Sequence, residues 1–238
     1  MFSFLACANA DTSASGTAAG TDSAVTASES MAGSTDSSAT TPTDTAGTTA
    51  TSTNAQPGAA PQENKSMAQG KIAELHTTAG QIDIRFFPEA APNHVQNFIS
   101  LAERGFYDGT KFHRVIPDFM IQGGDPNSKD DNAKNSWGTG GSGTNVKAEF
   151  NEIPHKRGIV SMARSQHPDS ASSQFFIVVK DSNFLDRNYT VFGEVVRGME
   201  VADKIVSAPK GANDRPHDPT AITKIVIRDA REGEIAAK

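Results

Sequence analysis

Hydrophobic and polar residues alternate in short stretches along the second part of the chain, which is the pattern of half-buried β-strands. Two such stretches, 72–75 and 81–86, flank a turn that ends in Gly80, and this arrangement predicts a hairpin. Further stretches rich in β-branched and aromatic residues are separated by Gly, Pro, Asn and Asp. They predict six more strands, at 112–116, 119–122, 158–163, 175–179, 190–196 and 222–227.

Two segments have the spacing of an amphipathic helix instead. The first begins at Pro92 and ends before Gly105, a residue type suited to the position just past a helix end. The second covers about 199–206. Eight strands and two helices without strict β-α-β alternation predict a mainly β fold, a closed eight-stranded antiparallel barrel capped by two α-helices. Composition alone leaves a β-sandwich as an equal alternative.

The beginning of the chain shows neither pattern. Residues 8–64 contain no Lys, Arg, Leu, Ile or aromatic residue, so they cannot bury enough apolar surface to offset their ordering entropy. We therefore expect a disordered Ser/Thr/Ala/Gly-rich tether over 8–66 and one folded domain over 67–238. The formal net charge of −6 belongs to the tether, because the remaining 22 acidic residues balance all 22 basic ones. A neutral domain does not favour nucleic acid or anionic membranes as partners.

Cys7 is the only cysteine, which excludes an intrachain disulfide and a cysteine-based metal site. The sequence Phe4-Leu5-Ala6-Cys7 resembles the end of a bacterial lipoprotein signal, where a lipid is attached to the cysteine after cleavage. Only six residues precede Cys7, fewer than the roughly 7–15 apolar residues of a signal, so we expect the true start to lie upstream and residues 1–7 to be a signal remnant. This interpretation predicts membrane anchoring in the bacterial cell envelope or periplasm. The alternative is an accidental cysteine in a cytoplasmic protein.

Motifs for nucleotide, metal or hydrolytic chemistry lack their context. The run from Gly138 to Gly143 satisfies G-x-G-x-x-G, but a polar segment precedes it and no amphipathic helix follows. The six histidines show no metal-ligand spacing, and no serine lies in a G-x-S-x-G elbow. We therefore expect neither a cofactor nor a metal.

A long specific segment runs from Phe112-His113-Arg114-Val115-Ile116-Pro117 through Asp118-Phe119-Met120-Ile121-Gln122-Gly123-Gly124-Asp125. It is followed by Ser161-Met162-Ala163-Arg164, Ser173-Gln174-Phe175-Phe176-Ile177, Phe184-Leu185-Asp186 and Val191-Phe192-Gly193-Glu194-Val195. In this order and spacing the set resembles the cyclophilin family of peptidyl-prolyl cis-trans isomerases, particularly the compact bacterial members. The resemblance covers residues 71–229 and implies an eight-stranded barrel capped by two helices, as the residue pattern does.

The resemblance also implies a peptide site, in which Arg114 matches the catalytic arginine. Phe119, Met120, Phe176 and Leu185 match the proline pocket, and Gln122, Ala163, Arg164 and Gln174 match the peptide groove. Phe184 and Tyr189 complete the substrate-binding set, at positions where many eukaryotic members carry Trp and His. Taken singly, the apolar residues would be interpreted as core and Arg114 as half of an ion pair. The complete set favours the site, with the Gly-rich loop at its flank.

The implied activity needs no covalent chemistry. Rotation about an X-Pro bond crosses a barrier of ~18–20 kcal/mol, and a site accelerates it by binding the twisted bond more tightly than either planar form. The apolar pocket would hold the proline ring while Arg114 donates a hydrogen bond to the prolyl nitrogen. We expect a monomer that acts on proline-containing unfolded or flexible polypeptides and assists their folding. A peptide-binding module without turnover is the rival hypothesis.

Overall fold

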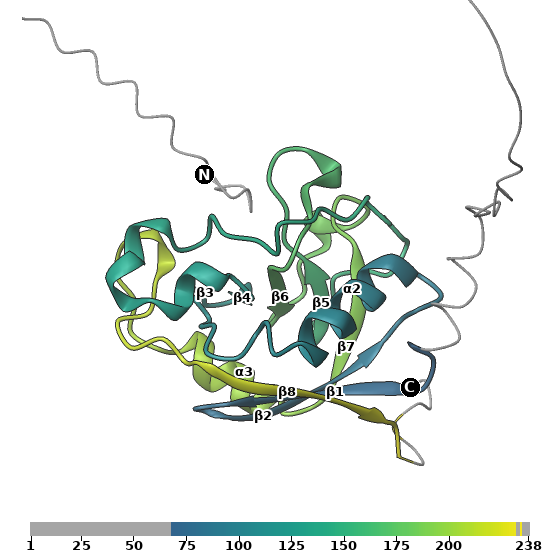
Figure 1. Ribbon diagram of the computed structural model, residues 1–238, viewed down its shortest axis with the longest axis horizontal. Coiled ribbons are helices and arrows are strands. Elements are labelled where there is room, and N and C mark those ends of the chain that lie inside the picture. Colours follow the sequence, from purple (N-terminus) through teal and green to yellow (C-terminus); the bar gives the residue numbers. More distant parts are fainter. Residues whose placement is uncertain (1–67, 232–233, 235–238) are drawn as a thin grey trace, which may run out of the picture. The chain divides into compact units, whose positions relative to one another are not determined.

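The structure, a computed structural model, describes residues 68–231 and 234. These residues form one eight-stranded antiparallel sheet with the strand order β3-β4-β6-β5-β7-β2-β1-β8 (Figure 1). All eight strands lie where the alternating pattern predicts them. Their bounds are β1 Lys71–Thr77, β2 Gly80–Phe86, β3 Arg114–Ile116, β4 Met120–Gly123, β5 Ile159–Met162, β6 Phe175–Val178, β7 Val191–Arg197 and β8 Ile222–Asp229. The expected tether and Cys7 lie outside the described residues.

Both predicted helices are confirmed. Helix α2 (Pro92–Glu103) packs against β7 and β8, and α3 (Met199–Val206) packs against β2, β3 and β4. Gly105 follows the end of α2 with φ +67°, a conformation that glycine adopts without strain. The loops among the described residues also contain five short 3₁₀ helices that the sequence pattern does not reveal, η1 Pro126–Lys129, η2 Asp131–Ser136, η3 Pro168–Ser170, η4 Asn183–Leu185 and η5 Ala212–Asp214.

The strand ladder does not support the expected closure of the barrel. The sheet curls, but its outer strands β3 and β8 share no ladder in the described part of the chain. β3 has only three residues, and the ammonium group of Lys210 donates to the carbonyl of Val115 in this short strand at 3.2 Å. The chain ahead of β3 meets the chain ahead of β8 through an isolated bridge between Lys111 and Ala221. A half-barrel is therefore the correct description.

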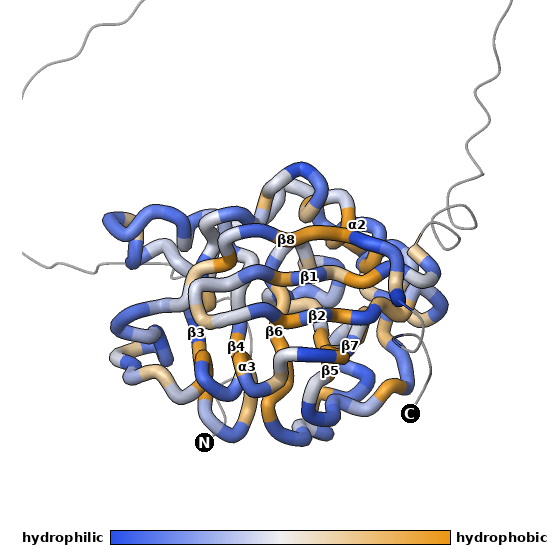
Figure 2. The backbone as a smooth tube through the Cα atoms, turned by 90° about the horizontal axis from the view of Figure 1, so that it is seen from below, coloured by the Kyte–Doolittle hydropathy of each residue, from blue (hydrophilic) through white to orange (hydrophobic). Residues whose placement is uncertain are grey.

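Two hydrophobic clusters lie on opposite faces of the strands β3 to β6. Side chains of successive strand residues point to opposite faces, so Val115, Ile121 and Ile177 join the large cluster under α2, whereas Met120 and Phe176 join a second, smaller cluster. Figure 2 shows the hydrophobic residues concentrated along the strands, with hydrophilic residues in many of the connecting loops. The second cluster gives β4, β5 and β6 two covered faces, and all their residues are buried.

Candidate functional site

The second cluster brings together most of the predicted apolar site residues. Phe119 packs against it from the turn between β3 and β4, and η4 contributes one residue from a distant loop. The members that the sequence analysis names are Met120, Ala163, Phe176, Leu185 and Tyr189. Residues spread over 70 positions of sequence thus form one apolar surface, in which Met120 and Phe176 lie on the paired strands β4 and β6, and Leu185 and Tyr189 come from the loop between β6 and β7.

Arg114 lies at the edge of this surface. Strand pairing aligns Arg114 with Gln122 on β4, Gln122 with Phe176 on β6, and Phe176 with Ser161 on β5. Directly paired residues share a face of the sheet, so the guanidinium group and the Phe176 ring occupy the same side. The Arg114 side chain is 19% exposed, and its Nε lies 3.8 Å from a carboxylate oxygen of Asp214. Arg114 therefore takes part in an ion pair and also borders the apolar cluster.

Two buried glutamines connect Arg114 to the Gly-rich loop. Arg114 Nη1 donates to Gln122 Oε1 at 3.4 Å, and Gln122 Nε2 donates to Gln174 Oε1 at 2.9 Å. Gln174 Nε2 then donates to the carbonyls of Gly138 and Gly140 at 3.0 and 2.8 Å. Every amide points the same way, so the bonds polarise one another and hold the glutamine side chains in a single orientation.

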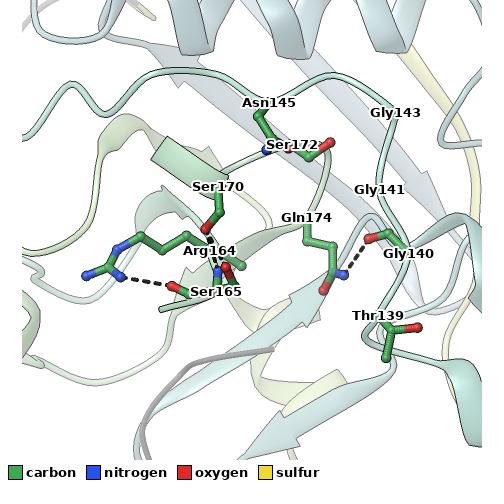
Figure 3. A pocket seen from close by; sticks show the side chains of 11 residues that line it. Thr139, Gly140, Gly141, Gly143, Asn145, Arg164, Ser165, Ser170, Ser172 and Gln174 are labelled. Carbon is green, nitrogen blue, oxygen red and sulfur yellow. Dashed lines mark hydrogen bonds between the residues drawn. The ribbon is translucent and has the colours of Figure 1, made fainter. Parts of the chain in front are cut away.

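A groove of about 430 Å³ opens beside Gln174. One wall is the Gly-rich loop, and the other contains Ala163, Arg164 and hydroxyl groups such as those of Ser165 and Ser170 (Figure 3). Three predicted groove residues, Ala163, Arg164 and Gln174, line it, whereas Arg114 and the apolar pocket residues do not. The predicted site therefore has two parts, an apolar surface beside Arg114 and a more polar groove, which meet at the glutamine pair.

Loop contacts fix the remaining predicted residues. The Arg164 guanidinium donates to the carbonyl of Asn188 at 3.1 and 3.0 Å and lies 4.8 Å from the centre of the Tyr189 ring. Tyr189 in turn packs edge-on against Phe176, with ring centres 5.8 Å apart. Phe184 is 63% exposed, and its ring centre lies 5.3 Å from that of Phe119. Phe119 and Phe184 form an accessible aromatic rim beside the buried cluster.

Two buried titratable groups flank the glutamine pair. Burial lowers the pKa of His113 to about 4, and the positive charges of Arg114 and Arg215 act in the same direction, so this imidazole is neutral at pH 7. Burial raises the pKa of Asp125, while backbone N–H groups of Asn127, Gly138 and Gly140 oppose that shift. Asp125 thus holds the Gly-rich loop by accepting hydrogen bonds from its backbone.

Sequence reasoning did not single out His155, whose ring lies against Phe176, or its two side-chain partners Ser161 and Asp186. Ser161 and Asp186 stand within the motifs that carry the resemblance, but His155 stands outside all of them. Its contact with Asp186 spans 31 positions and has no signature in spacing. Within residues 68–231 and 234, no three His, Cys, Asp or Glu side chains gather in a way that could hold a metal ion.

Comparisons with known proteins agree on one family. Residues 72–227 match the family described as cyclophilin type peptidyl-prolyl cis-trans isomerase/CLD. The chain is 40% identical over 176 residues to the peptidyl-prolyl cis-trans isomerase of Acinetobacter baylyi, covering 66% of this chain and 85% of that protein. It is 45% identical over 167 residues to isomerase A of Dickeya dadantii, covering 66% and 82%. The similarity to isomerase 9 of Schizosaccharomyces pombe, 43% over 172 residues, covers 70% of this chain and only 27% of that protein.

Solved structures show the same fold. A Cryptosporidium parvum cyclophilin type isomerase, crystallised in the presence of the dipeptide Ala-Pro, is 32% identical with a TM-score of 0.60 and covers 66% of this chain and 99% of its own. A cyclophilin from Hirschia baltica is 30% identical with a TM-score of 0.54, covering 65% and 73%. The family match spans most of the described residues and every motif that carries the cyclophilin resemblance. The chain therefore belongs to the cyclophilin-type peptidyl-prolyl cis-trans isomerases, and its enzyme activity is the isomerisation of X-Pro peptide bonds.

Proposed function

We propose that Arg114 catalyses this isomerisation by donating a hydrogen bond to the prolyl nitrogen while the apolar surface holds the proline ring. Rotation breaks amide resonance and localises the lone pair on that nitrogen, so a donor placed there stabilises the twisted state more than either planar state. No covalent step is required. Arginine suits the task because it stays charged and presents a fixed fork of donors.

The alignment of Arg114, Gln122 and Phe176 on one face of neighbouring strands carries this proposal. A proline ring that reaches Phe176 and Met120, both buried in this structure, would lie next to the guanidinium group, within the span of three paired residues. Asp214 and Gln122 restrict where the guanidinium can point, which limits the entropy lost when a substrate binds.

The substrate class is proline-containing unfolded or flexible polypeptides, and the role is assistance to protein folding. The relative crystallised with Ala-Pro supports a proline-containing ligand for this chain. The groove beside Gln174 would accept chain residues ahead of the proline, with carbonyls of the Gly-rich loop and serine hydroxyls available for backbone contacts. A formally neutral domain accepts varied sequences without steering them by charge.

The proposal is tested by measuring cis-trans exchange of a short X-Pro peptide by NMR with the parent protein and Arg114→Ala. Loss of a charged hydrogen bond worth about 1.5–3 kcal/mol in the twisted state lowers kcat/KM roughly 10- to 150-fold. Arg85→Ala is the matched control, because Arg85 is 15% exposed and paired with Glu194, away from the Arg114 face. Equal exchange rates for Arg114→Ala and the parent would overturn the mechanism. Peptide binding by the parent without exchange would favour the rival binding module.

We further propose that the domain is held at the bacterial cell envelope by a lipid on Cys7, and acts there as a monomer. The short apolar start before Cys7 and the polar segment after it support this location. In the part of the chain that the structure describes, no helix has the length and apolar character needed to cross a bilayer. Mass spectrometry of the native protein tests the proposal: a diacylglyceryl-modified Cys7 at the N-terminus is expected, and an unmodified Met1 would refute it.

A further inference from the structure

The imidazole of His155 lies against the ring of Phe176. The two rings are nearly parallel, with an interplanar angle of 14° and centres 6.1 Å apart. The His155 side chain is fully buried, and Phe176 is also fully buried. Phe176 contacts a second ring edge-on, that of Tyr189, at 85°. The orientation of the pocket's central ring is therefore set by two neighbouring aromatic rings.

Hydrogen bonds fix the plane of the His155 ring. Its Nδ1 lies 3.0 Å from Asp186 Oδ1, and its backbone N–H donates to the same oxygen at 2.8 Å. A carboxylate only accepts, so Nδ1 carries the proton. On the far side of the ring, Nε2 lies 3.2 Å from Ser161 Oγ. Burial lowers the pKa of His155 while Asp186 opposes the shift, which agrees with a neutral ring in this setting.

The hydrogen-bond partners of His155, which are Asp186, Ser182 and Ser161, belong to the segments that build the proline pocket. Asp186 follows Leu185 directly, and the His155 carbonyl accepts from the backbone of Ser182 at 2.8 Å, so the loop that carries η4 is fastened to His155 twice. Ser161 lies on β5, opposite Phe176 in the strand register. One imidazole thus joins the loop that carries Leu185 to the strand pair that carries Phe176.

Ser161, His155 and Asp186 are connected in the same way as the serine, histidine and aspartate of a hydrolytic triad, but the serine is not accessible. Ser161 is 0% exposed, and both His155 Nε2, at 3.2 Å, and the carbonyl of Thr190, at 2.8 Å, compete for the single hydrogen of its hydroxyl. A nucleophile must reach a substrate carbonyl, and this hydroxyl faces only protein. The arrangement therefore holds side chains in place instead of attacking a bond.

We propose that His155 is a positioning residue of the isomerase site, whose ring, fixed by Asp186 and Ser161, sets Phe176 relative to Leu185 in the proline pocket. The inference rests on the proposed use of Phe176 as the surface that receives the proline ring. Such a residue acts on the binding of the ring in planar and twisted states alike, so its loss raises KM and leaves kcat nearly unchanged. Loss of mere stability does the opposite, because it lowers the active fraction and hence the apparent kcat without changing KM.

Two substitutions distinguish the contribution of the His155 ring from the contribution of its hydrogen bonds. His155→Asn retains a donor for Asp186 but removes the ring that lies against Phe176, whereas His155→Phe retains a flat ring. His94→Asn is the matched control: His94 is also fully buried and also directs its backbone N–H and Nδ1 to one carboxylate oxygen, of Glu149, at 3.0 and 2.6 Å. It lies on α2, and neither the second cluster nor the glutamine pair includes it.

NMR exchange on an X-Pro peptide is expected to show KM raised roughly five- to tenfold in His155→Asn, with kcat within about twofold of the parent. His155→Phe keeps a ring without its hydrogen bonds and is expected to raise KM less than His155→Asn does, whereas His94→Asn is expected to leave KM at the parent value. An unchanged KM in His155→Asn, or an equal rise in His155→Phe, would overturn the role of the ring.

Two further measurements do not depend on turnover or on the folded fraction. The ¹³C-methyl signal of Met120, a neighbour in the same cluster, is expected to shift in His155→Asn and to stay in place in His94→Asn. The dissociation constant of Ala-Pro, measured by titration, is expected to rise with KM. If the parent binds Ala-Pro but does not isomerise it, the proposed catalytic mechanism fails. The dissociation constants of Ala-Pro for the parent and the His155 variants still test the positioning role in that case. An unmoved Met120 signal in His155→Asn would contradict the positioning role.

Discussion

Glu149 caps helix α2 from a loop that lies far away in sequence, and replacing it with glutamine should destabilise the domain. Ala91 provides no side-chain cap for this helix, and the first turn contains no acidic residue. Glu149 Oε1 instead accepts from the backbone and side-chain amides of Asn93 at 3.1 and 2.7 Å, and Oε2 accepts from His94. The carboxylate also places a negative charge at the positive end of the helix dipole.

The magnitude follows from counting lost acceptors. Glu149→Gln is nearly isosteric but converts one oxygen into an NH₂ group, which leaves two of the four donors without an acceptor. Two hydrogen bonds at about 1 kcal/mol each, with about 0.3–1 kcal/mol for the helix charge, give a loss of about 2–3 kcal/mol. For a domain of this size the melting temperature falls by roughly 4–12 °C. Activity per folded molecule is expected to stay unchanged, because none of the four donors belongs to the candidate site.

Thermal unfolding followed by circular dichroism at pH 7 and at acidic pH tests both the size and the cause. Burial raises the pKa of Glu149, but hydrogen bonds from the side chain and backbone of His94 and from Asn93 outweigh burial, so the pKa in the folded state lies below its ordinary value of 4.5. A lowered folded-state pKa means that the stabilisation is complete above about 4.5 and is lost as the pH falls through the folded-state value. The gap between parent and variant should therefore close in acid. A melting temperature within 1 °C of the parent at pH 7, or an equal gap at both pH values, would refute the reasoning.

Three further outcomes are expected. Gln174→Leu removes the donor to the carbonyls of Gly138 and Gly140, so kcat/KM for an X-Pro tetrapeptide should fall about tenfold while the far-ultraviolet circular dichroism stays native. Gly140→Ala would place a Cβ 2.2 Å from Asp125 Oδ1, so the loop must move and KM for the tetrapeptide should rise. Met120→Ala empties a fully buried position and should lower the free energy of unfolding in urea by about 2–5 kcal/mol; a loss below 1 kcal/mol would place Met120 outside a packed cluster.

The strands and helices were predictable because local physics controls them. Alternation specifies a strand that has two different faces, and the spacing of Val95, Phe98 and Ile99 specifies the buried side of α2. Gly105 has the positive φ that ends a helix. The 3₁₀ helices were not predictable, since segments such as η2 are polar turns without a buried residue, and contacts with the rest of the fold determine their conformation.

The candidate site was predictable only through whole motifs. Single residues such as Phe176 and Leu185 look like ordinary core residues in sequence, and both are indeed buried. The resemblance places them in a pocket, and strand register explains how Phe176 shares one face of the sheet with Arg114. The ion-pair interpretation of Arg114 is also correct in part, because Asp214 lies beside it.

By itself the sequence determined which segments form strands, where two helices begin and end, and to which enzyme family the domain belongs. These properties depend on residue type and near spacing. Tertiary structure alone decided that the curled sheet leaves β3 and β8 without a shared ladder, that Glu149 caps α2, and that His155 lies between Asp186 and Ser161 under Phe176. Each of these contacts joins segments brought together by the register and curl of the sheet, so no local pattern could encode them.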